Sequence, residues 1–97
     1  MKIRVTSWRG DHNGEVAEME VAQAIFEKFS GKRTEALPQE YKAKVPDTFG
    51  ELQALWTDGK VEGCTPIGLD ENGEIVAMKD FNPQVREMVV LQPIAAG

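Results

Sequence analysis

One six-residue pattern occurs twice in this 97-residue chain, as DHNGEV at residues 11–16 and as DENGEI at residues 70–75. Both copies lie between segments that alternate apolar and polar residues, as half-buried strands do. An Asp side chain accepts hydrogen bonds from backbone amides ahead of it, while Asn and Gly tolerate positive φ. We therefore predict that each copy is the turn of a β-hairpin, with Gly14 and Gly73 at positive φ.

The flanking segments predict where the N-terminal strands lie. The segment KIRVTSW, residues 2–8, alternates from its first residue, and EVAEMEV, residues 15–21, alternates again. A helix from Glu15 is the competing interpretation, but Val16 falls on the wrong side of such a helix and Glu18 interrupts its apolar arc. We therefore predict strands near residues 2–8 and 14–20.

Helical spacing begins at about Met19 and predicts a helix near residues 20–30. Gly31 is suited to a left-handed cap, with Lys32 and Arg33 beside the negative helix end. The apolar stripe of this helix contains Met19, Ala22, Ile25, Phe26 and Phe29.

The segment DTFGELQALWTDG predicts a second helix near residues 48–57. Thr48 and Glu51 have the spacing of a capping box, and Gly59 closes the end. We expect Leu52 and Leu55 of this helix to face the sheet together with Phe26 and Phe29. Residues 34–46 contain two prolines and no sustained period, so they predict a connection, with room for a short turn of helix.

The last third of the chain returns to strand patterns, at residues 65–69, 74–81 and 85–94. The predicted order is β-β-α-α-β-β-β, with the helices grouped in the middle of the chain. This order is typical of a single α+β domain over residues 1–97, in which two helices cover an antiparallel or mixed sheet of four to five strands.

Charge is unevenly distributed along the chain. The net charge is −5, and residues 61–97 contribute −4 of it, from six acidic and two basic residues. An acidic surface repels nucleic acid and attracts basic proteins. The alternative is a solvated face that keeps the protein soluble. We expect a cytoplasmic protein, because Cys64 is the only cysteine and no segment has the apolar length of a signal peptide or membrane span.

Catalytic and metal motifs are missing from the sequence. It contains no glycine-rich phosphate loop, no H-E-x-x-H and no G-x-S-x-G. Cys64 and His12 are the one pair that could form a nucleophile and base, but a lone cysteine is more often a small apolar residue. Asp11, Asn13 and Glu15 begin a calcium-loop pattern that the following residues do not complete. We expect no enzyme activity, no cofactor and no metal.

The first strand carries a small basic and aromatic surface of Lys2, Arg4, Arg9 and Trp8. The acidic balance of the chain argues against direct nucleic-acid binding by these residues. Trp8 ends the strand on its polar face and is a candidate contact residue, because interfaces favour Trp, Tyr and Arg. Packing over the protein's own hairpin is the alternative role for this ring.

The acidic residues around the second DxNG turn form the main candidate site. We expect a non-catalytic module that binds a protein with a basic surface, and neither nucleic acid nor a membrane. Its function would be to inhibit or modulate a nucleic-acid-handling protein, as small acidic phage proteins do. The candidate contact residues are Asp70, Glu71, Glu74, Asp80 and Trp8.

A second hypothesis comes from a resemblance. The strand-hairpin-helix opening and the ending VVLQPIAAG resemble the β-grasp sulfur carriers of the MoaD and ThiS type, whose tails end in two glycines. The resemblance implies a carrier that reacts through Gly97. Here Ala96 replaces the first glycine.

Overall fold

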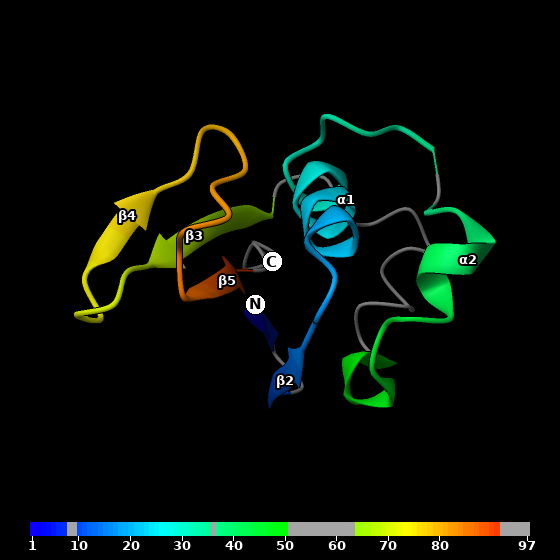
Figure 1. Cartoon of the computed structure of the whole chain (residues 1–97), viewed down its shortest axis with the longest axis horizontal. Coiled ribbons are helices and arrows are strands. Elements are labelled where there is room, and N and C mark those ends of the chain that lie inside the picture. Colours follow the sequence, from blue (N-terminus) through cyan, green and yellow to red (C-terminus); the bar gives the residue numbers. More distant parts are fainter. Residues whose placement is uncertain (8–9, 36, 51–63, 92–97) are drawn as a thin grey trace, which may run out of the picture.

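The computed structural model shows an α+β protein with one five-stranded mixed sheet and two helices, in the predicted order (Figure 1). It describes residues 1–7, 10–35, 37–50 and 64–91. The strands are β1 (Lys2–Ser7), β2 (Gly10–Glu15), β3 (Thr65–Leu69), β4 (Ile75–Ala77) and β5 (Glu87–Leu91). The helices are α1 (Met19–Phe29) and α2 (Gln39–Lys42), followed by the 3₁₀ turn η1 (Asp47–Phe49).

The strand order across the sheet is β2-β1-β5-β3-β4. The first and last strands, β1 and β5, pair in parallel, with Val5 opposite Val90. The pairs β1–β2, β3–β4 and β3–β5 are antiparallel. Hairpin β3–β4 therefore lies at one side of the sheet, and Figure 1 shows it at the opposite end of the molecule from α2.

Helix α1 packs on one face of the sheet, which we call the inner face. Phe26 and Phe29 are buried in the core, as predicted. The strand residues of this face include Ile3 and Val5 of β1, both fully buried, because alternate strand residues point to the same side. Helix α1 begins at Met19 and ends before Gly31, whose φ of 78° confirms the predicted left-handed position.

The N-terminal hairpin differs from the prediction. The pattern DHNG lies within β2, paired with β1 so that His12 is opposite Val5 and Gly14 is opposite Ile3. Gly14 does not have positive φ; that conformation occurs at Gly10, with φ 120°. The predicted strand at 14–20 was therefore wrong. Ser7 pairs with Gly10, so the connection falls at residues 8–9, outside the described residues.

Burial explains why the strand ends early. Ala17 and Met19, which alternate in the predicted strand, are both exposed. The residues that follow at helical spacing, Val21, Ala22 and Ile25, are buried against the sheet instead. Burying this stripe removes more apolar surface from water than two more strand residues would.

Gly14 is required by packing rather than by a turn. A Cβ built on Gly14 would lie 2.9 Å from Cζ of Phe49, in η1, and 3.0 Å from Oγ1 of Thr48. Phe49 is fully buried. The absence of a side chain at Gly14 thus lets η1 pack against β2.

The C-terminal hairpin confirms the prediction for the second copy of the pattern. Strands β3 and β4 pair with Leu69 opposite Ile75. The Asp70 carboxylate accepts hydrogen bonds from the backbone amides of Asn72 and Glu74, each 2.9 Å long. Gly73 has φ 77°. One pattern therefore forms a turn in this hairpin and an extended strand in the other.

The second predicted helix lies largely outside the described residues, and so do Leu52 and Leu55. The described part, η1 and Gly50, begins with Asp47. Strand β4 is shorter than predicted, since it ends at Ala77, and β5 begins at Glu87.

Gly73→Ala should destabilise the protein by about 1 kcal/mol, because an L-residue is strained at positive φ. Gly73→Asn should restore part of the loss, since Asn tolerates this region. The matched control is Gly50→Ala, because Gly50 has helical φ and open space around its Cβ position. Urea unfolding measures all three variants, and equal stability of Gly73→Ala and the native chain would refute the turn geometry.

Gly14→Ala should destabilise by about 1–3 kcal/mol, as overpacking does in cores. Phe49→Ala should cost about 3–5 kcal/mol through the cavity that it leaves. In the double variant the cost of Gly14→Ala should largely vanish, because its steric conflict is with the Phe49 ring. A double-mutant cycle by denaturant unfolding checks this, and additive effects would show that the ring is not the conflicting group.

Candidate functional site

The turn of hairpin β3–β4, residues 70–74, is the centre of the candidate site. It is closed by hydrogen bonds from the Asp70 amide to the Glu74 carbonyl and from the Gly73 amide to the Asp70 carbonyl, both 3.0 Å. The Asp70 side chain is used within the turn. Glu71 and Glu74 are exposed and form no ion pair with any residue that the structure describes. The two glutamates are thus the carboxylates that remain for a partner.

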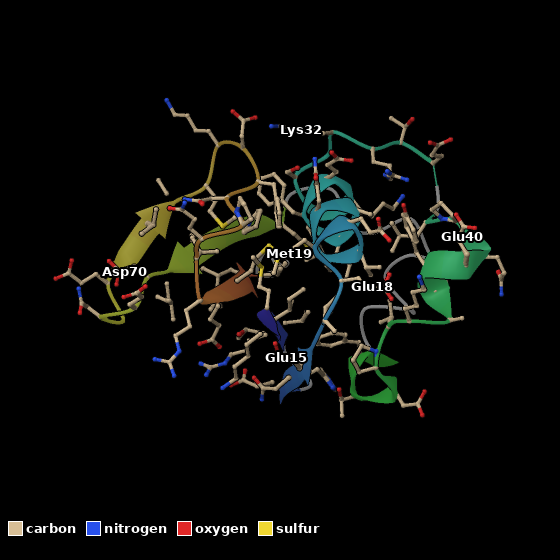
Figure 2. The ribbon with its side chains drawn as sticks, viewed as in Figure 1. Glu15, Glu18, Met19, Lys32, Glu40 and Asp70 are labelled. Carbon is tan, nitrogen blue, oxygen red and sulfur yellow. The ribbon has the colours of Figure 1, made fainter. Side chains whose placement is uncertain are left out.

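The turn projects between two hollows. One, of about 500 Å³, lies toward β1 and β5, and its charged lining residues are Lys2, Glu15, Asp70, Glu71, Arg86 and Glu87. The other, of about 520 Å³, lies on the opposite side and includes Val76, Asn82 and Val85. Figure 2 shows Asp70 at the outer end of the hairpin, far from Glu40 on α2. A projecting turn with open space on both sides is accessible to another protein.

Arg86 is the described basic residue just before β5. Its backbone amide donates a hydrogen bond of 2.9 Å to the Leu69 carbonyl, which holds it beside the hairpin. The first hollow therefore contains Arg86 and Lys2 among its acidic groups. The field there is mixed, so the negative field is strongest at the tip, at Glu71 and Glu74.

Asp80 lies apart from the tip and has a partner of its own. Its carboxylate forms an ion pair with Lys32, which follows α1, and Lys32 also donates a hydrogen bond of 2.8 Å to the Lys79 carbonyl. The hydrogen bond from Lys32 lowers the pKa of the Asp80 carboxyl. Phe26 and Phe81 are in ring contact nearby, 6.0 Å between centroids. The ion pair of Asp80 with Lys32 thus connects the segment after β4 to the C-terminal end of α1.

Trp8, the other candidate contact residue, lies outside the described residues, as does Arg9. Two members of the predicted basic surface, Lys2 and Arg4, lie on the outer face of the sheet, away from α1. There the Arg4 guanidinium donates to the Asn13 amide oxygen and lies 3.3 Å from the Glu87 carboxylate. Arg4 is therefore engaged by acidic and polar neighbours of its own chain.

The residues considered in the sequence for metal binding or nucleophilic chemistry are Glu15, Cys64 and His12, and the structure shows the surroundings of each. Glu15 binds the N-terminal ammonium at 2.9 Å, and the described residues contain no group of three or more metal-ligating side chains. Cys64 is buried, which raises the pKa of its thiol and disfavours the reactive thiolate. His12 lies in β2, not at a turn tip as predicted, and its buried Nε2 has no hydrogen-bond partner within the described residues.

Sequence reasoning missed an apolar surface on the outer face of the sheet. Strand register brings together on this face alternate residues of β3, β4 and β5: Ile67, Leu69, Ile75, Ala77, Val89 and Leu91. We call these six residues the apolar face. Ile75 is 72% exposed and Leu91 is 42% exposed. The sequence held one signal of it: residues 88–91 are a continuous apolar run, which makes β5 apolar on both sides, although helix α1 covers only one.

No protein-family model, curated protein or solved structure matches this chain. Among the described residues, no helix combines the length and the apolar character needed to span a membrane.

Asp80→Asn should lower the melting temperature at about pH 7 and have no effect at about pH 2. The folded-state pKa of Asp80 is lowered, so its ion pair stabilises above the ordinary pKa of Asp and is lost as pH falls through the lowered value. Glu71→Gln is the control, because it removes an exposed carboxylate without a described ion pair. A pH-independent difference between native and Asp80→Asn would contradict the ion-pair account.

Proposed function

We propose that this protein is a non-catalytic binding module that presents the turn of hairpin β3–β4 to a basic surface of another protein. The observation that carries the proposal is the pair of exposed glutamates, Glu71 and Glu74, on a turn fixed by the Asp70 side chain and Gly73. Because the backbone of the turn is already held by hydrogen bonds, only the side chains of the two glutamates lose conformational freedom on binding. The proposed effect on the partner is inhibition or modulation of a nucleic-acid-handling protein, because such proteins expose basic surfaces.

The negative charge supports fast, salt-sensitive association. The chain has a net charge of −5, and exposed charges are screened beyond about 10 Å at 0.1 M salt. Electrostatic complementarity acts chiefly on the association rate. The alternative role of these acids is to keep an edge hairpin soluble and to discourage strand pairing at β4.

The experiment begins with capture of partners from cell extract by the native chain, followed by association kinetics with each purified partner. Glu71→Lys/Glu74→Lys should lower the association rate about tenfold or more, and the rate of the native chain should fall steeply between about 0.05 and 0.3 M salt. Dissociation should change less.

The matched control is Glu35→Lys/Glu40→Lys, which makes the same change of net charge on two exposed residues away from the hairpin. Glu18 is unsuitable as a control, because it forms an ion pair of 2.7 Å with Lys44. Equal association rates for the two double variants would show that the acidic tip is only a solvated surface and does not contact the partner. Asp80→Asn should change the association rate less than the tip variants do, because the Asp80 carboxylate already forms an ion pair with Lys32.

The sheet order favours one further candidate function, a β-grasp-like carrier. The hairpin β1–β2, the helix across the sheet and the parallel pairing of β1 with the last strand support this resemblance. The reactive residue would be Gly97, which lies outside the described residues. Intact mass after incubation in cell extract tests the carrier, which should gain an adduct at Gly97; an unchanged mass together with salt-sensitive binding supports the module instead.

A further inference from the structure

The apolar face and the acidic tip are parts of one continuous surface. In the register of the sheet, Leu69 and Ile75 are paired at the end of the hairpin, immediately before and after the turn that carries Glu71 and Glu74. The remaining residues of the apolar face extend from there along β3 and across to β5. Helix α1 covers the opposite face. On the apolar face Ile75, Ala77 and Leu91 are exposed, Ile67 and Leu69 are half-buried, and Val89 between them is buried.

We propose that this surface binds an amphipathic basic helix of the partner protein, with the helix's apolar stripe on the apolar face and its Lys or Arg residues at the acidic tip. The proposal rests on the proposed function and names the kind of partner segment that the tip recognises. A helix laid there would complete a three-layer arrangement, in which both apolar faces of the sheet are covered.

Charge complementarity selects this occupant over a second copy of the chain. Another copy would bring an acidic tip of its own and a net charge of −5. Like charges placed together at an interface are unfavourable. A partner segment with cations beside its apolar residues meets the uncompensated carboxylates of Glu71 and Glu74 instead.

The edge of the sheet argues for a helix rather than an added strand. Strand β4, the edge beside the apolar face, is three residues long, Ile75–Ala77. Short edge strands offer few backbone groups for pairing. Along β3, the distance from Leu69 to Thr65 is four residues, about 13 Å, which corresponds to between two and three turns of a helix. A stripe at i, i+3 or i+4 and i+7 fits that length.

The test uses synthetic peptides as probes. The first has Leu at helical spacing and Lys elsewhere; the second has the same composition with Leu and Lys alternating; the third replaces Lys by Glu. Binding is measured by anisotropy of the labelled peptides, and the site is mapped by backbone amide shifts. The first peptide should bind with shifts concentrated at residues 67–77 and 89–91. Binding of the alternating peptide with equal affinity, or shifts centred on α1, would overturn the proposal.

Substitutions in the chain provide the matched comparison. Ile75→Ser and Leu91→Ser should each weaken binding of the first peptide about tenfold, the loss expected for one partly buried aliphatic side chain. Met19→Ser is the control, because Met19 is 43% exposed, like Leu91, but lies on α1, away from Asp70 (Figure 2). Equal weakening by Met19→Ser would show unspecific apolar contact and overturn the proposal.

Ile75, Leu91 and Met19 are exposed, so their substitution by Ser should leave the folded state intact. The melting temperature of each variant checks this. The third peptide should not bind, because its Glu residues would lie at the acidic tip, and binding equal to that of the first peptide would overturn the proposal. Ala77→Glu, also at an exposed position, adds a charge to the apolar face and should weaken binding of the first peptide.

The experiments distinguish failure of the proposed function from failure of the helix-binding proposal. If Glu71→Lys/Glu74→Lys has no effect on binding while Ile75→Ser weakens it, recognition by the acidic tip is refuted and binding through the apolar face stands. The reverse pattern overturns the helix-binding face and leaves the acidic function standing.

Discussion

The parallel pairing of β1 with β5 is the contact on which the rest of the structure depends. Within the described residues it is the only ladder that joins hairpin β1–β2 to strands β3 and β4. Its inner side chains, such as Val5 and Val90, are fully buried. Because the pairing links the first strand to the last, the chain between them must pass from one side of the sheet to the other, and α1 packs on the inner face. A parallel pair requires such a connection. The same pairing leaves β3–β4 at one side of the sheet, where its turn projects.

This arrangement separates the two roles of the sheet. The inner face holds the core, whereas the outer face has a charged part, on β1 and β2 and at Glu87 of β5, and an apolar part formed by the six residues of the apolar face. On the charged part, Arg4 donates a hydrogen bond to Asn13 and forms an ion pair with Glu87. The apolar part borders this charged part, with Val89 opposite Arg4 and Leu69 opposite Glu87, and it adjoins Glu71 and Glu74 at the turn. An exposed apolar surface rimmed by charges is typical of sites that contact other proteins. The proposed functions follow from this position rather than from a catalytic group.

The sequence predicted those elements whose signal is local. Helix α1 followed from its apolar stripe and from Gly31, and the β3–β4 turn followed from Asp70 and Gly73. The N-terminal hairpin failed because the same DxNG pattern is compatible with an extended strand, and the choice was decided by a distant residue, Phe49, which packs where Gly14 has no side chain. The sequence predicted the acidic residues of the site as one cluster, but the Asp80 carboxylate forms an ion pair with Lys32, 48 residues earlier in the chain. The apolar run at residues 88–91 indicated a strand that is apolar on both sides, but strand register was needed to show which residues of β3 and β4 lie beside it.

Hydrogen–deuterium exchange of the native chain, with and without a captured and purified partner, tests the account most directly. Amide exchange reports protection segment by segment, so it locates an interface without any substitution. We predict that the partner slows exchange in residues 67–77 and 89–91, and that α2 and the exposed side of α1 are unchanged. Protection centred on α1, α2 or β2, with exchange in residues 67–77 unaltered, would contradict the assignment of the interface to this hairpin.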